Sequence, residues 1–161
     1  MVTEFYPSIQ ENIKWLKNQT DCFDLKFRSV TVDKHAYCLV FLGGITGNSE
    51  LISVVESFVM RKDNLALYAS EVSEPQNLQQ ALDQLLCGMA LVLLDEKPYG
   101  VIVDTRNYPS RKTSEPSVEK SIRGARDGFT EHIMINLGLI RRRIRDPKLT
   151  IKFLVVGNRT K

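Results

Sequence analysis

Apolar residues recur at helical spacing in three parts of the first hundred residues. Ile9, Ile13 and Leu16 lie on one side of the first such segment, SIQENIKWLKN. An apolar face with this spacing is typical of a helix that packs on a core. Each segment also begins after a residue that favours a helix start, proline or asparagine. The predicted helices cover residues 8–18, 49–62 and 76–87, and Gly88 is expected to end the last one.

Four other segments have the composition of strands. In FDLKFRSVTV the apolar Phe23, Leu25 and Phe27 alternate with polar residues, which indicates a half-buried strand. AYCLVFLGG follows it after a polar break that contains His35, so the two are expected to form a hairpin. MALVLLD and YGVIVDT, separated by EKP, predict a second pair of strands with a tight turn.

The last third of the chain has a different organisation. The polar, proline-containing segment of residues 107–118 predicts a linker, with a short helix expected over residues 118–125. Beyond it, Thr130 is expected to cap a helix that continues to about Arg145. Asp146 and Pro147 would end that helix, and LTIKFLVVG would follow as a strand. The predicted buried face consists of Ile133, Leu137, Ile140 and Ile144, which places Arg141, Arg142, Arg143 and Arg145 on the surface.

Helices and strands are interspersed, so the fold class is a mixed α+β (α/β) fold with small sheets flanked by helices. We expect a first α/β subdomain over residues 1–106 and a linker over residues 107–118. Residues 119–161 would begin a second small subdomain that is truncated.

The composition fits a soluble chain, cytoplasmic in type. With 161 residues and 43% hydrophobic residues, the chain is long enough for one core, or for one domain and part of another. Its apolar runs are shorter than the roughly 20 residues that a membrane-spanning helix needs, and the N-terminus lacks a secretory signal. Cys22, Cys38 and Cys87 have scattered spacing, which favours free thiols in a reducing compartment.

Positive charge is concentrated at the C-terminal end. Residues 1–120 hold 12 basic and 16 acidic residues, a net charge of −4, whereas residues 121–161 hold 10 basic and 3 acidic residues, a net charge of +7. Arginines in this pattern can contact nucleic-acid phosphates, anionic lipid, or carboxylates of another unit. Nucleic-acid binding is not expected, because Phe129 is the one aromatic residue between Tyr108 and Phe153. The lipid and subunit alternatives stay open.

The sequence does not indicate an enzyme, a cofactor or a metal site. His35 and His132 are the two histidines, and neither stands at metal-ligand spacing with a second histidine. The turn LGGITGNSE lacks the complete motif of a phosphate-binding loop and predicts a plain turn before a helix. Glu115 and Glu119 lie one helical turn apart near several arginines, so we expect them to form salt bridges, as we do for the pair Asp104 and Arg106.

One stretch carries a more specific resemblance. SIRGARDGFTEHIMINLGLIRRRIRDPKL, residues 121–149, resembles the signature of the spore germinant-receptor A-subunit family, the GerA family. The matching residues are Arg123, Gly124, Arg126, Asp127, Gly128, Phe129, Glu131, Asn136, Leu139, Ile140, Arg141, Arg142 and Arg143. Upstream, Arg111, Glu115, Pro116 and Glu119 also resemble the family's segment leading into that signature. Weaker similarity extends over most of the chain, and Ala125 before RDGF is similar to the stage V sporulation protein AF branch.

The resemblance implies a soluble N-terminal domain of two small α/β subdomains, followed by a membrane domain. It places the full-length protein in the spore inner membrane, with this domain on the core side. It further implies other subunits of a germination membrane complex as partners and a homo-oligomer of the full-length protein.

The hypothesis that follows is a domain that contributes to assembly or gating of an ion-release channel during germination. In it, the motif arginines bind carboxylates such as Glu115, Glu119, Asp127 and Glu131, within the domain or across subunits. The alternative is a sensor of a small-molecule nutrient, and a nucleic-acid-binding module is the least favoured function.

Overall fold

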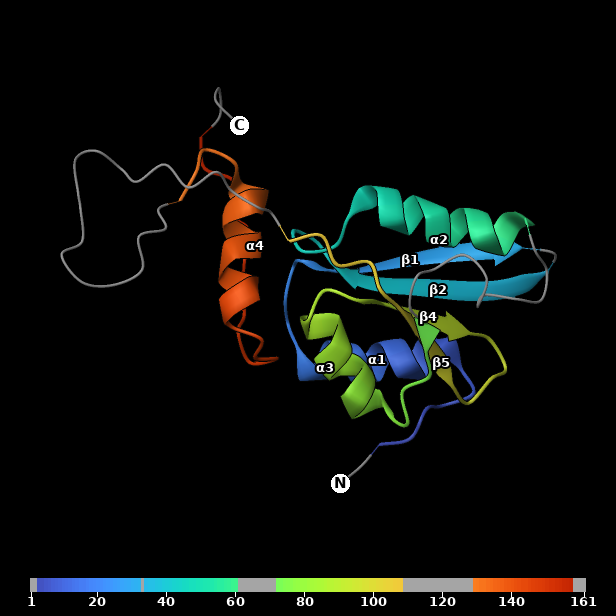
Figure 1. Cartoon of the computed structure of the whole chain (residues 1–161). Coiled ribbons are helices and arrows are strands. Elements are labelled where there is room, and N and C mark those ends of the chain that lie inside the picture. Colours follow the sequence, from blue (N-terminus) through green and yellow to red (C-terminus); the bar gives the residue numbers. More distant parts are fainter. Residues whose placement is uncertain (1–2, 33, 61–71, 109–128, 158–161) are drawn as a thin grey trace.

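Nine helices and strands make up the described part of the chain. The computed structural model describes residues 3–32, 34–60, 72–108 and 129–157 (Figure 1). The helices are α1 (Ile9–Gln19), α2 (Asn48–Met60), α3 (Leu78–Leu86) and α4 (Ile133–Arg143), and the strands are β1 (Leu25–Val32), β2 (His35–Leu42), β3 (Val72–Ser73), β4 (Ala90–Leu94) and β5 (Gly100–Val103). The mixed α+β class predicted from the sequence is therefore confirmed.

The strands form one sheet in the order β1-β2-β4-β5-β3, and all four neighbouring pairs are antiparallel. β1 and β2 make a hairpin whose register runs from Val32 opposite His35 to Leu25 opposite Leu42. Both predicted strand pairs are thus confirmed, although His35 begins β2 instead of lying in the turn. Because β1 begins where β2 ends, residues 22–24 and 43–44 meet at one end of the sheet.

Helices cover both faces of the sheet. α1 and α3 lie on one face and α2 lies on the other (Figure 1). The larger core cluster joins leucines of α1 and α3 to Cys38, Val40 and Leu91 of the strands. The smaller cluster joins Leu51 and Val54 of α2 to Leu39, Ala90, Val92, Val101 and Val103. Removal of these apolar side chains from water is the main stabilising contribution to the fold.

The glycine-bearing turn before α2 is a structural turn, as the sequence predicts. The chain after β5 pairs with it: the Gly47 N–H donates to the Thr105 carbonyl (3.0 Å), and the Asn107 N–H donates to the Ile45 carbonyl (3.0 Å). The backbone donor of Gly47 is therefore already used. This contact also brings the chain after β5 back toward the end of the sheet where β2 finishes.

A leucine of α3 provides a test of the core. Leu82 is 1% exposed, whereas Ile52 on α2 is 54% exposed. We expect Leu82→Ala to lower the free energy of unfolding by about 2–5 kcal/mol, because it leaves a cavity. Ile52→Ala is the control, with a change of about 0.5 kcal/mol or less. Urea unfolding followed by circular dichroism measures both, and equal losses in the two variants would contradict this placement of the core.

Candidate functional site

Helix α4 lies beside the end of the sheet where β1 begins and β2 ends (Figure 1). The turn after β2 contacts it directly. A Cβ atom added at Gly44 would lie 3.1 Å from the Met134 carbonyl oxygen and 3.4 Å from the Gly138 nitrogen, and Gly44 has φ +92°. Close approach of backbone to backbone therefore requires glycine at position 44. We refer to the contact formed by Asp24, Gly44, Gly138 and Arg141 as the α4 joint.

The centre of the α4 joint is a buried ion pair. Both side chains, of Arg141 and Asp24, are 0% exposed. Arg141 Nε donates to Asp24 Oδ2 at 2.9 Å, and Arg141 Nη2 donates to Asp24 Oδ1 at 3.1 Å. This two-point geometry matches the planar guanidinium to the carboxylate and fixes the orientation of both groups. The pair joins positions 117 residues apart in the sequence.

Asp24 stabilises the charge of the buried arginine. Burial disfavours the cation, but the hydrogen bonds and charge attraction from Asp24, with a contribution from Cys22, outweigh that effect and raise the pKa of Arg141. Arg141 is therefore charged at neutral pH. A buried charge of this kind depends on its partner, because removal of either group leaves the other uncompensated.

The chain that follows α4 packs on the residues that precede β1. Leu149 accepts hydrogen bonds from Arg141 Nη2 (3.2 Å) and from Cys22 Sγ (2.8 Å). The Phe23 N–H donates to the Ile151 carbonyl (3.2 Å), and the rings of Phe23 and Phe153 lie 5.5 Å apart. Residues 22–24 are thus held between the sheet and the chain beyond α4.

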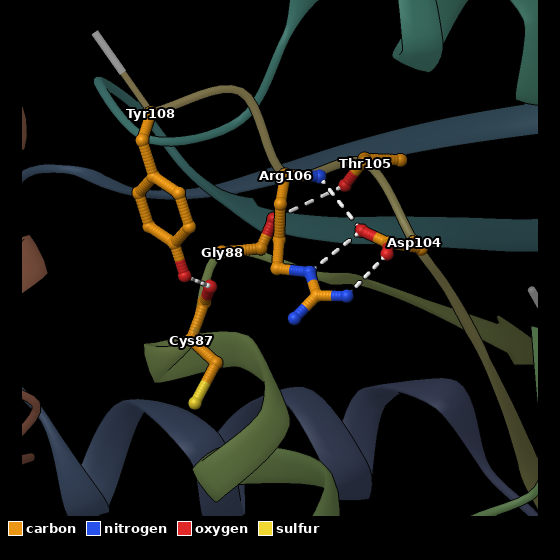
Figure 2. Close-up of polar contacts among 6 residues, drawn as sticks. All are labelled: Cys87, Gly88, Asp104, Thr105, Arg106 and Tyr108. Atoms are coloured by element: carbon orange, nitrogen blue, oxygen red, sulfur yellow. Dashed lines mark hydrogen bonds and ion pairs between the residues drawn. The ribbon is translucent and has the colours of Figure 1, made fainter. Parts of the chain in front are cut away.

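A second set of contacts joins α4 to the chain after β5. The Tyr108 hydroxyl donates to the Cys87 carbonyl at 2.6 Å (Figure 2). The guanidinium of Arg142 lies over the Tyr108 ring, 5.7 Å from its centroid. Arg145 Nη1 donates to Cys87 Sγ at 3.5 Å. Arg142 in the last turn of α4 and Arg145 just after the helix therefore contact the segment that leaves β5 and the C-terminal end of α3.

The expected pair of Asp104 and Arg106 is confirmed in the same region. Arg106 Nε and Nη2 donate to the two carboxylate oxygens of Asp104, at 2.9 and 2.5 Å (Figure 2). The hydrogen bond from the Arg106 side chain is the main reason that the pKa of Asp104 is lowered. Beside this pair, Thr105 Oγ1 donates to the Gly88 carbonyl at 3.3 Å. This arrangement stabilises the backbone after β5.

Asn136 fixes the approach to α4. Its Oδ1 accepts from the Thr130 N–H (2.7 Å), and its Nδ2 donates to the Thr130 carbonyl (2.6 Å). The same arrangement occurs in α1, where Asn12 binds the N–H and the carbonyl of Tyr6 at 3.0 and 2.7 Å. In both helices an asparagine amide holds the backbone six residues earlier. The signature asparagine therefore has a clear structural role.

The predicted site residues fall into two groups. Arg111, Glu115, Glu119, Arg123, Gly124, Arg126, Asp127 and Gly128 lie outside the described residues. The structure describes Phe129, Glu131, Asn136, Arg141, Arg142 and Arg143. Phe129 and Glu131 are exposed, and Arg143 Nη1 donates to the Leu139 carbonyl within α4 (3.1 Å). Arg141 and Arg142 make the long-range contacts described above, and Asn136 holds the loop before α4.

The predicted orientation of α4 is wrong for three residues, although Leu137 is buried and Arg142, Arg143 and Arg145 are exposed as predicted. Arg141 is buried instead of lying on the surface, whereas Ile133 is 57% and Ile144 46% exposed. The buried residues are Leu137, Gly138, Leu139 and Arg141. The reason is that close backbone contact at Gly138 and the ion pair at Arg141 decide which side faces the sheet. The helix also begins at Ile133, after His132, instead of being capped by Thr130.

Two further expectations differ from the structure. The alternation in FDLKFRSVTV predicts Asp24 on the polar side of a strand, but β1 begins at Leu25 and the Asp24 side chain is fully buried. The apolar segment after α4 was predicted to be a strand, yet residues 150–157 carry no strand assignment. In that segment Leu154 is 82% and Val156 83% exposed.

Within the described ranges, no group of three or more histidine, cysteine, aspartate or glutamate residues is arranged to hold a metal ion. Likewise, no helix among the described residues has the length and hydropathy needed to span a bilayer.

Comparison with known proteins places this chain in a family. The chain belongs to the Bacillus/Clostridium GerA spore germination protein family, whose family model matches residues 12–161. The signature resemblance is thereby confirmed.

The relatives are sporulation and germination proteins. The chain is 33% identical over 171 residues to stage V sporulation protein AF of Bacillus subtilis (strain 168), covering 97% of this chain and 35% of that protein. It is 31% identical to spore germination protein B1 of the same organism, covering 95% of this chain and 35% of that protein. The chain thus spans only 35% of the length of each of these relatives.

A solved structure shares the fold. The N-terminal domain of the A subunit of the Bacillus megaterium spore germinant receptor GerK3 matches with a TM-score of 0.72 and 21% sequence identity. The match covers 99% of this chain and 64% of that chain. The similarity supports the α+β fold described above.

The ion pair of the α4 joint is open to a direct test. We expect Arg141→Leu to lower the free energy of unfolding by about 3–5 kcal/mol, because Asp24 is left buried and unpaired. Arg142→Leu, one residue further along the helix, loses an exposed contact with Tyr108 and should cost about 1 kcal/mol or less. Urea unfolding measures both, and similar losses would show that the ion pair is not what stabilises this end of the fold.

The asparagine contact predicts a local effect. Asn136→Ala removes the groups that bind the Thr130 backbone, so we expect faster hydrogen exchange at the Thr130 amide and a loss of about 1 kcal/mol. The neighbouring, exposed Glu131→Ala is the control and should leave that exchange unchanged. If the Thr130 amide kept its protection in Asn136→Ala, the Asn136 side chain would not be what holds it.

Proposed function

We propose that this domain contributes to assembly and gating of a germination membrane complex, as the N-terminal part of a longer, germinant-receptor A-subunit-like protein. The observation that supports the proposal is the buried pair of Arg141 and Asp24. It fixes the helix that carries the family signature to the hairpin that begins the fold. A pair of this kind couples the position of α4 to the position of the β1–β2 hairpin, and this coupling needs no catalytic group.

The geometry supports a connecting role for α4. Its N-terminal end follows residues 109–128, which carry most of the remaining signature, and its C-terminal end leads to the exposed apolar residues 153–156. Exposed apolar residues of this kind are typical of surfaces that another unit covers. We therefore propose that residues 119–161 begin a second small subdomain and that residues 153–156 pack inside it, with 107–118 as the linker.

In this proposal the longer protein lies in the spore inner membrane, and this domain faces the spore core. Its partners are other subunits of the complex and further copies of the same protein. The exposed cations of α4, Arg142 among them, supply charge for contact with carboxylates of those partners. The names of the relatives, which are spore germination and sporulation proteins, support this assignment.

The proposal predicts the effect of a conservative change in the full-length protein. Arg141→Lys keeps the charge but loses the two-point contact with Asp24, so we expect slower germination and less assembled complex in spores. Arg28→Lys, a change at an exposed arginine of β1, is the control and should germinate at the normal rate. Loss of spore optical density measures germination, and native gel electrophoresis with immunoblotting measures assembly.

Normal assembly and normal germination in both variants would contradict the proposal. Normal assembly with slow germination in Arg141→Lys would instead separate gating from assembly.

Nutrient sensing stays a prediction of the family resemblance. A thermal-shift screen with amino acids, sugars and nucleosides on the two-subdomain protein tests it.

A further inference from the structure

A thiol lies next to the α4 joint. Cys22 stands two residues before Asp24 and is half-buried. Its Sγ donates to the Leu149 carbonyl at 2.8 Å and accepts from Thr20 Oγ1 at 3.1 Å. The sulfur therefore lies between the segment that enters β1 and the chain that follows α4.

The buried guanidinium beside this thiol has one nitrogen donor without an acceptor. Arg141 uses Nε and Nη2 for Asp24 and Leu149. Its Nη1 is buried and has no hydrogen-bond partner, one of two such side-chain atoms in the part of the chain that the structure describes. A buried donor without an acceptor is unfavourable, because it has lost its hydrogen bonds to water and gained none in return.

That guanidinium lies close to the sulfur. Arg141 Nη2 and Cys22 Sγ both donate to the Leu149 carbonyl, at 3.2 and 2.8 Å, so the two groups meet at one acceptor. A hydrogen bond with Cys22 is also among the causes that raise the pKa of Arg141, after the larger effects of burial, which lowers it, and of Asp24, which raises it. An oxygen atom added to the sulfur would thus be placed next to a buried arginine. The geometry combines a reachable thiol with an unsatisfied donor suited to an oxygen.

We propose that Cys22 is an oxidation site, at which a hydroperoxide converts the thiol to a sulfenic acid whose oxygen accepts a hydrogen bond from Arg141 Nη1. In the reaction the sulfur attacks the outer oxygen of the hydroperoxide. The S–O bond forms as the O–O bond breaks, and the thiol proton leaves with the departing oxygen as water or an alcohol. Sulfur loses two electrons, and the hydroperoxide gains them.

Oxidation changes the α4 joint. The sulfur no longer carries a proton for the Leu149 carbonyl, and the new oxygen accepts from Arg141 Nη1, which had no partner before. The turn that follows α4 therefore loses the hydrogen bond between its Leu149 carbonyl and Cys22, just before β1. Oxidation of Cys22 would loosen the docking of the signature helix without changing the sheet.

The other two cysteines are internal references. Cys38 is fully buried in the main core, and burial raises its pKa to about 11, so it stays an unreactive thiol. Cys87 is half-buried like Cys22, and its arginine partner, Arg145, is exposed to water. A preference for Cys22 over Cys87 would therefore reflect the buried donor and not simple access.

The experiment treats the chain with hydrogen peroxide in the presence of dimedone, which traps sulfenic acids, and maps the adducts by peptide mass spectrometry. We expect several-fold more adduct on Cys22 than on Cys87 and almost none on Cys38. The same treatment in urea at full unfolding should label the three cysteines alike. Hydrogen exchange after peroxide should rise in residues 144–151 of the native chain and not in Cys22→Ser.

Two further results decide the proposal. Arg141→Lys lacks Nη1 and should lose most of the preference for Cys22. Should that variant fail to fold, the native and unfolded chains still provide the comparison. Equal or greater labelling of Cys87 in the native chain, or a Cys22 preference that persists in urea, would overturn the proposal. These outcomes do not depend on the germination role, because no germination assay enters them.

Discussion

The buried contact between Arg141 and Asp24 is the constraint on which the C-terminal part of the described fold depends. Each group would be unfavourable in the interior alone, and together they satisfy each other in a two-point geometry. The pair also explains neighbouring features. The Leu149 carbonyl accepts a hydrogen bond from the guanidinium of Arg141. The backbone carbonyl of Asp24 accepts the Gly43 N–H at 2.8 Å, which fixes the turn after β2 against α4.

The sheet and its flanking helices follow from local patterns in the sequence. Helical spacing predicted α1, α2 and α3, and strand composition predicted β1, β2, β4 and β5 within a few residues. β3 has two residues, which is too short for a periodic pattern. These elements were predictable because each has an apolar face whose burial is decided by the residues of that element alone.

The α4 joint was not predictable in the same way. Apolar periodicity assigns the buried side of a helix to its isoleucines, whereas the sheet contacts Gly138 and Arg141. Asp24 lies before its strand and its partner is far along the chain, so no local spacing marks it. The signal available in the sequence was the family signature, which contains Arg141 and Asn136 but gives no indication of Asp24. A charge pair between distant segments is visible only once the fold brings them together.

The contact between Gly44 and Gly138 has a mechanical consequence. Side chains can change rotamer and absorb a displacement, but here backbone meets backbone, and 3.4 Å separates the Gly138 nitrogen from the Cβ position of Gly44. A force applied along α4 would therefore pass directly into the β1–β2 hairpin, with little compliance at the point of contact. The stiffness of this end of the domain resides in two residues that have no side chain.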